Sequence, residues 1–223
     1  MTELLEAVQA FLALGGPVVA ILLAMSVLAL ALVLVKLWQF RRAGVGDHGA
    51  LLAALDLADR GTTQAAQRQA AEARSHLAPL AVLALNAAGE TDALRARLTG
   101  LAEEAIARLQ SGFRLLDSIA QVAPLLGLFG TVLGMITAFQ ALQEAGANVD
   151  PSALAGGIWV ALLTTTVGLG VAMPAALVLT WFESRVAREA RLAIQIVDVA
   201  LCRGLAQDTC PMDARASTPL AHA

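Results

Sequence analysis

The chain contains few charged residues for its length. Charged residues make up 15% of its 223 residues, hydrophobic residues make up 58%, and the mean hydropathy is +0.70. Soluble domains usually have about 25% charged and roughly 45–50% apolar residues. Aromatic residues, at 4%, are too few for the aromatic girdles of a membrane β-barrel. The composition therefore predicts an integral membrane protein that is built from helices.

Motifs of soluble catalysis are also missing. The chain has no GxSxG nucleophile motif, no phosphate-binding loop, no HExxH zinc motif and no basic–aromatic patch suited to nucleic acid. Cys202 and Cys210 are expected to be ordinary thiols, since no further metal-ligand pair lies near them. His48, His76 and His222 are expected to be isolated surface or loop residues. We therefore expect no enzyme activity, no metal, no cofactor and no nucleic-acid partner.

Two long stretches contain no ionisable side chain. There is no Asp, Glu, His, Lys or Arg between Asp117 and Glu144, or between Asp150 and Glu183. About 20 apolar residues span a bilayer as a helix, so each stretch predicts a membrane span, and residues 18–35 predict another. Ion paths through membranes usually contain an ionisable residue that faces the bundle interior. This chain supplies no such group at that depth.

Basic residues are confined to two parts of the chain. All 15 Lys and Arg lie between Lys36 and Arg114 or between Arg185 and Arg215. The N-terminal segment and the loop at residues 144–151 have none. By the positive-inside rule, this distribution places the N-terminus outside and the C-terminus inside.

The polar region between the first two spans is expected to be helical. Alanine-rich stretches at residues 51–60, 62–77 and 79–88 are separated by glycine or proline. From Asp92 onward, apolar residues recur at spacings of three and four, which is typical of an amphipathic helix. No proline interrupts the chain from there to Ala123, so we expect this helix to continue unbroken into the second span.

The second span is rich in glycine. Gly127, Gly130 and Gly134 lie along one side of residues 121–140, although glycine costs about 1 kcal/mol relative to alanine inside a soluble helix. In a membrane, small residues allow two helix backbones to approach closely, and Gly-x-x-x-Gly has the spacing that does so. The third span has two similar ridges. One ridge consists of Thr164, Gly168, Ala172 and Ala176. The adjacent ridge consists of Gly157, Ala161 and Thr165.

Hydroxyl groups are the main polar groups at depth. Thr131 lies about 18 Å from the inner end of the second span, and Thr164 and Thr165 lie at roughly the same depth in the third. Pro124 and Pro174 fall at matching depths nearer the cytoplasm. Each threonine taken alone could simply bond a carbonyl of its own helix. Opposed hydroxyls at one depth favour a shared polar lining.

Two motifs in these spans resemble the signature of the ExbB/TolQ/MotA proton-channel family. They are residues 123–135 (APLLGLFGTVLGM), followed by Phe139, and residues 157–174 (GIWVALLTTTVGLGVAMP). The three-span layout and the outside N-terminus fit the ExbB/TolQ branch, since the MotA branch normally has four spans. The specific match covers residues 115–185. One position departs from the pattern, because Val160 stands where ExbB and TolQ commonly have Glu.

The resemblance implies an all-α membrane protein that forms a homo-pentamer around a single-span ExbD/TolR-like partner. The partner's transmembrane Asp would carry the proton, and the second and third spans would line the pore. Thr131 and Thr165 match the family's pore threonines, and Thr164 beside them is expected to line the same proton path. Helix packing and hinge motion would rest on Pro124, Gly127, Gly130, Gly134, Gly168 and Pro174.

This interpretation divides the chain into eight segments. They are a periplasmic amphipathic helix (1–16), the first span (17–38), a cytoplasmic helical domain (39–117), the second span (118–142), a periplasmic loop (143–152), the third span (153–182), a cytoplasmic helix (183–207) and a disordered tail (208–223).

The expected function is that of an ExbB-like subunit of a proton channel in the bacterial inner membrane. Such a subunit would use the proton-motive force to energise TonB-dependent transport across the outer membrane. A TolQ-like subunit of the Tol–Pal envelope system, which works through a TolA-like protein, is the first alternative. A non-conducting membrane scaffold is the second, and Val160 keeps it open. The sequence leaves open whether the ion is a proton or sodium.

Overall fold

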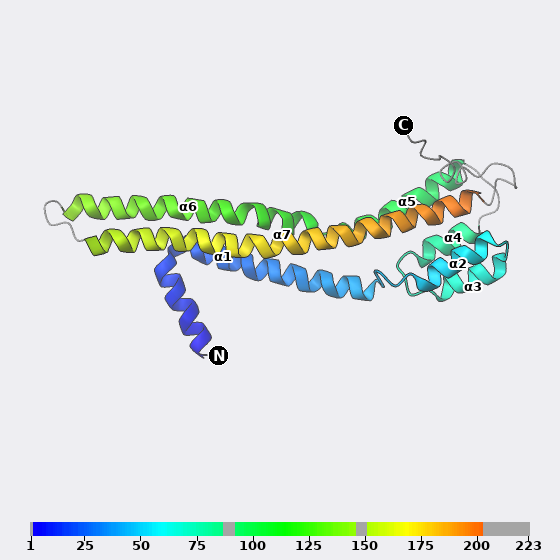
Figure 1. Cartoon of the computed structure of the whole chain (residues 1–223), viewed down its shortest axis with the longest axis horizontal. Coiled ribbons are helices and arrows are strands. Elements are labelled where there is room, and N and C mark those ends of the chain that lie inside the picture. The colour runs from blue at the N-terminus through cyan, green and yellow to red at the C-terminus, as the bar shows by residue number, and fades with distance from the viewer. Residues whose placement is uncertain (1, 87–91, 146–150, 203–223) are drawn as a thin grey trace, which may run out of the picture. The chain divides into compact units, whose positions relative to one another are not determined.

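A computed structural model describes residues 2–86, 92–145 and 151–202, and every regular element in these ranges is a helix (Figure 1). The chain divides into two compact units. Unit 1 comprises Met1–Leu37 and Gly112–Phe182, and unit 2 comprises Trp38–Ser111 and Glu183–Ala223. The helices are α1 (Thr2–Arg42), α2 (Gly49–Asp59), α3 (Thr63–Glu72), α4 (Ala78–Asn86), α5 (Asp92–Gln110), α6 (Phe113–Ala145) and α7 (Pro151–Cys202).

Three segments of the described chain are long and apolar enough to cross a membrane. They are Gly16–Arg42, a stretch within Asp92–Glu144, and a stretch within Leu154–Val199. The prediction of an all-α chain with three helices that are able to span a membrane is thereby confirmed for these residues. The centre of the expected loop at 143–152 and the whole expected tail at 208–223 lie outside the described residues.

The helix α1 bends at Gly16. This residue has φ 64° and ψ −165°, and Pro17 follows it. A left-handed φ is easily adopted only by glycine, and proline supplies no backbone N–H to the preceding turn. As a result α1 has two helical parts that point in different directions (Figure 1), and the second part begins the first apolar segment.

The continuous helix expected from Asp92 into the second span is not observed. The helix α5 ends at Gln110, α6 begins at Phe113, and Gly112 between them has φ 82°. A glycine in this conformation is a common way to end a helix. The prediction followed the apolar periodicity and the lack of proline, and it gave too little weight to this glycine.

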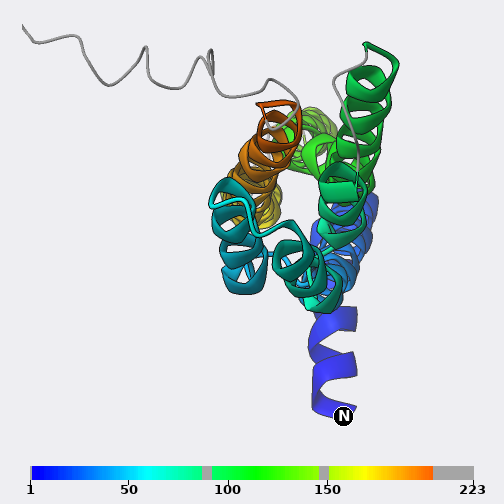
Figure 2. The same cartoon turned by 90° about the vertical axis from the view of Figure 1, so that its right-hand side faces the viewer.

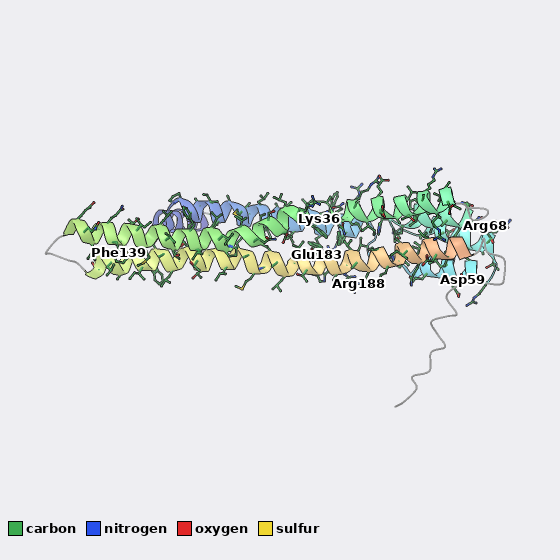
Figure 3. The ribbon with its side chains drawn as sticks, turned by 90° about the horizontal axis from the view of Figure 1, so that it is seen from above. Lys36, Asp59, Arg68, Phe139, Glu183 and Arg188 are labelled. Carbon is green, nitrogen blue, oxygen red and sulfur yellow. The ribbon has the colours of Figure 1, made fainter. Side chains whose placement is uncertain are left out.

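Unit 1 is held together by contacts among α1, α6 and α7. The helices α6 and α7 run side by side in both views (Figures 1 and 3). Val18 and Leu22 of α1 pack against Ala123 of α6 and Ala172 of α7. These residues are small or β-branched at three of the four positions, which suits a tightly packed bundle.

An aromatic cluster lies at the end of unit 1 where α6 begins. The rings of Phe113 and Phe182 stack with 5.9 Å between their centroids. The buried ammonium group of Lys36 lies 5.5 Å from the centroid of the Phe113 ring. A cation over an aromatic face is attracted by the ring quadrupole, so this cluster ties α1, α6 and α7 together.

Unit 2 has its own apolar core, formed by α2, α3, α4, α5 and the last part of α7. Figure 2 shows this unit from its end. Charged side chains such as Asp59 of α2 and Arg68 of α3 are exposed (Figure 3). The large, fully buried residues of the core include Leu51, Leu77, Leu98 and Ile196.

This core gives a matched pair of variants on α7. Ile196→Ala removes a side chain that is 0% exposed, whereas Ile194→Ala removes one that is 58% exposed. Loss of a buried Ile side chain typically costs about 2–5 kcal/mol, so Ile196→Ala should clearly lower the midpoint of thermal unfolding in detergent. The midpoint of Ile194→Ala should change much less. Equal losses in the two variants would contradict the assignment of this core.

Candidate functional site

The backbones of α6 and α7 come very close where glycines of α6 face small residues of α7. A Cβ atom on Gly127 would lie 3.0 Å from the Thr164 carbonyl oxygen and 3.3 Å from the Gly168 Cα. A Cβ atom on Gly134 would lie 3.0 Å from the Ala161 Cβ. Side-chain carbons need more room than this, so the two helices are in contact through their backbones.

The same close contact is seen from α7. A Cβ atom on Gly168 would lie 2.6 Å from the carbonyl oxygen of Ala123, and one on Gly157 would lie 2.5 Å from the Ala138 Cβ. The glycine ridge of α6 therefore packs against α7 of the same chain. The stripe of α7 that makes or borders this contact has spacings of three and four, and consists of Gly157, Ala161, Thr164, Gly168, Ala172 and Ala175.

Two threonine hydroxyls gather at one carbonyl group of α6. Thr164 is 2% exposed, and its Oγ1 lies 3.3 Å from the Gly127 oxygen and 2.7 Å from the Ala161 oxygen. Thr165 is half-buried, and its Oγ1 lies 3.4 Å from the same Gly127 oxygen. A hydroxyl has one hydrogen to donate, so Thr164 bonds one of its two carbonyls at a time. The two contacts with the Gly127 oxygen are long hydrogen bonds between helices. Together they make the Gly127 carbonyl a polar group in an otherwise apolar interface.

Gly130 is what allows Thr164 to reach this carbonyl. A Cβ atom on Gly130 would lie only 2.7 Å from both the Cβ and the Oγ1 of Thr164. Any larger residue would push the threonine side chain away. The predicted residues Gly127, Gly130, Thr164 and Thr165 are thus brought together, with Gly168 next to them.

Thr131 lies apart from this group. It is half-buried, and its hydroxyl donates to the Leu128 carbonyl of its own helix, with 2.6 Å between the oxygens. Thr137 and Thr166, which are exposed, likewise donate to carbonyls of their own helices. The hydrogen bond of Thr131 therefore fits the simpler interpretation of a threonine that bonds a carbonyl of its own helix.

The remaining predicted residues occupy helix interiors. Pro124 is half-buried in α6, and Pro174 is exposed in α7. A proline inside a helix leaves the carbonyl four residues earlier without its helical N–H partner, which makes bending easier there. Val160 is half-buried on α7. In the described part of the chain, no group of three or more His, Cys, Asp or Glu residues has the arrangement of a metal site.

A second polar cluster lies in unit 2, and the sequence analysis missed it. His48 Nε2 lies 2.8 Å from Glu189 Oε1, and His76 Nδ1 lies 3.8 Å from Glu189 Oε2. The expectation that these histidines are isolated is therefore wrong. Burial lowers the pKa of His76 below its ordinary value of 6.5, and the nearby Glu189 carboxylate opposes this shift.

One sequence signal pointed to this cluster. Glu189 is 1% exposed and lies on α7 in register with the buried residues Val186, Ala193 and Ile196. An acid on an apolar helical stripe must find a partner. The identity of that partner could not be predicted, because His48 lies 141 residues away in the chain.

The close approach of α6 and α7 can be tested with two glycines of the same helix. Gly168→Ala places a methyl group against the Ala123 carbonyl, whereas a Cβ atom on Gly170 would meet nothing within 4 Å. Overpacking of this kind typically costs about 1–3 kcal/mol. In detergent, Gly168→Ala should therefore unfold at a lower temperature than the unaltered protein, and Gly170→Ala should not. Equal unfolding temperatures for the two variants would count against this packing.

The profile of the MotA/TolQ/ExbB proton channel family matches residues 60–193. The biopolymer transport protein ExbB-like 1 of Synechocystis sp. is 35% identical over 170 residues, which cover 74% of this chain and 66% of that protein.

Two further relatives match a shorter region. The biopolymer transport protein exbB1 of Vibrio cholerae is 46% identical over 68 residues, which cover 30% of each chain. An ExbB homolog of Methanothermobacter thermautotrophicus is 48% identical over 68 residues, which cover 30% of this chain and 23% of that protein. Each match spans less than two-thirds of the relative's own length. The family profile matches more than half of the present chain, which therefore belongs to the MotA/TolQ/ExbB proton channel family, in its ExbB branch.

Proposed function

We propose that this chain is an ExbB-like subunit of a proton channel in the bacterial inner membrane, which uses the proton-motive force to energise TonB-dependent transport across the outer membrane. Family membership supports the channel class. The observation that carries the proposal is the uncharged polar contact between α6 and α7, where Thr164 and Thr165 meet the Gly127 carbonyl.

The membrane-spanning parts of α6 and α7 carry no charge, and this bears on which chain supplies the proton-binding group. Residues 118–143 and 151–182 contain no Asp, Glu, His, Lys or Arg. A proton that crosses the low-dielectric part of a membrane needs a group that binds and releases it. We therefore assign that group to the transmembrane Asp of a single-span ExbD/TolR-like partner. When this Asp is protonated it becomes neutral, which lowers the cost of its passage through the membrane.

The threonines have different roles in this proposal. Thr131 and Thr165 are half-buried within one chain, so part of each side chain is available to line a pore shared with neighbouring subunits. Thr164 is buried between α6 and α7, so we assign it to packing within the subunit. Val160 cannot supply the carboxylate that ExbB and TolQ commonly have at this position, so conduction rests on the partner's Asp, on hydroxyls and on water.

The proposed assembly is a homo-pentamer with the N-terminus outside and the C-terminus inside. The helix α6 carries large apolar side chains that are more than half exposed in the single chain, including Leu125, Phe129 and Phe139. Figure 3 labels Phe139 on this helix. In a bilayer such residues contact lipid or neighbouring copies. The distribution of Lys and Arg supports the orientation. A TonB-like protein would receive the mechanical work.

The pore threonines can be tested in vesicles that contain this chain and its single-span partner. Thr165→Val and Thr131→Val keep the side-chain shape and remove the hydroxyl. Loss of one stabilising hydrogen bond, about 1.4 kcal/mol, should slow proton flux roughly tenfold, as read from a pH-sensitive dye. Thr137→Val and Thr166→Val, which remove exposed hydroxyls bonded to their own helices, are the controls. Unchanged flux in Thr165→Val and Thr131→Val would contradict the assignment of these two hydroxyls to the pore. A lack of flux with the unaltered chain and its partner would favour a non-conducting scaffold.

The assignment of the titrating group to a partner has its own test. Vesicles that contain this chain alone should leak protons no faster than empty vesicles, because α6 and α7 hold no ionisable residue within their spans. Vesicles with the complete assembly should conduct. Equal proton flux with and without the partner would overturn this division of roles.

A further inference from the structure

Unit 2 contains a buried group of ionisable side chains that the proposed channel does not use. Glu189 of α7 is 1% exposed, whereas Glu183 and Arg188 in the same stretch of α7 are exposed (Figure 3). His48 directly precedes α2, and His76 lies between α3 and α4. The group therefore joins three parts of the unit that are far apart in the sequence.

The Glu189 carboxylate holds the segment that connects α1 to α2, residues 43–48. Its Oε1 accepts a hydrogen bond from the Gly46 backbone N–H at 3.1 Å and lies 2.8 Å from His48 Nε2. The backbone N–H of His76 donates to the Ala43 carbonyl at 3.0 Å. The connecting segment is thus held on one side by α7 and on the other by the turn before α4.

The backbone of this segment is shaped for close contact. A Cβ atom on Gly44 would clash with the carbonyl group of Arg74. Gly46 has φ 93°, and a Cβ atom there would lie 3.2 Å from Arg185 Nη1. Only glycine fits well at such positions. Because contacts of this kind tolerate little displacement, the segment has one well-defined position against Glu189.

Several polar atoms of the cluster are buried and have no hydrogen-bond partner within the described chain. They are His48 Nδ1, both ring nitrogens of His76, and Glu189 Oε2. A buried polar atom without a partner is unfavourable. Unused imidazole nitrogens next to a carboxylate are places where a proton can bind. A metal is disfavoured, because no His/Glu grouping in the described residues has metal-site geometry.

The charges that face the cluster come from each element around it. Arg185 approaches from α7, His48 from the connecting segment, and His76 from the turn before α4. A proton on His76 would add positive charge to a largely buried site, which is costly in a low dielectric. The nearby residues Asp47, Arg74 and Arg188 are exposed.

We propose that His48, His76 and Glu189 form a proton-binding site that releases residues 43–48 from α7 when the surrounding pH falls. The ligand is the proton itself. In the arrangement described here, which we call closed, both ring nitrogens of His76 are buried, and this burial disfavours the charged imidazolium. In the released arrangement the ring is hydrated and binds a proton more readily. Occupation by protons therefore favours the released arrangement.

The direction of the pH dependence follows from His76. Because burial lowers its pKa in the closed arrangement, the released arrangement binds the proton more readily. The closed arrangement is therefore fully stable above the ordinary histidine value of 6.5 and loses stability as the pH falls below it. This lies in the pH range in which histidine switches usually operate.

Hydrogen exchange of the full chain in lipid nanodiscs tests this proposal. Protection of peptides that cover residues 43–48 should fall roughly tenfold between about pH 7.5 and about pH 5.5, after correction for intrinsic exchange rates. His76→Gln has no titrating ring, so its protection should change much less over this range. Glu189→Gln should lower protection at every pH. His222→Gln, which removes the chain's remaining histidine, should behave as the unaltered protein does.

Two outcomes would overturn the proposal. One is an equal acid-induced loss of protection in the unaltered protein and in His76→Gln. The other is an equal loss in peptides from the core around Leu98, which would indicate general acid unfolding of unit 2. The readout is independent of proton flux, so failure of the channel proposal in vesicles leaves this test unaffected.

Discussion

The arrangement of unit 1 depends on the distance between the backbones of α6 and α7. In lipid, apolar burial does little to drive two helices together, so van der Waals contact and hydrogen bonds must do so. A methyl group on Gly168 would overlap the Ala123 carbonyl, and one on Gly127 would be closer to α7 than side-chain carbons usually are. The same closeness brings Thr164 and Thr165 within reach of the Gly127 carbonyl. The short distance between the two backbones therefore accounts both for the packing of α6 against α7 and for the polar contact at the Gly127 carbonyl.

This constraint also determines what the sequence could predict. The spans followed from composition and length, and the glycine ridge followed from spacing, because both are local properties. Which surface the ridge contacts is not local, since Gly-x-x-x-Gly fits a neighbouring copy as well as α7 of the same chain. The end of α5 was predictable in principle from Gly112. The contact of His48 with Glu189 was not, because 141 residues separate them.

The two units treat polar groups in opposite ways. In unit 1, the contact between α6 and α7 uses hydroxyls and a carbonyl, which need no counter-charge. In unit 2, a carboxylate is buried, and this is possible because the Gly46 N–H and the ring of His48 lie within hydrogen-bonding distance of Glu189. A buried charge is tolerated only with such partners. A carboxylate placed on the spans of α6 or α7 would find no cation there, which is a physical reason to assign the proton carrier to another chain.

Val160 bears directly on whether this chain must supply a carboxylate for proton conduction. The residue is half-buried on α7, at the position where ExbB and TolQ commonly have Glu. A valine there has no desolvation cost, whereas a glutamate would need either a proton or a polar partner to remain buried. The fold of unit 1 therefore does not require that carboxylate, since α6 and α7 pack through residues on the stripe from Gly157 to Gly168 without it. If the assembly conducts protons with valine at this position, the carboxylate tunes the path in other members of the family but is not a necessary step in it.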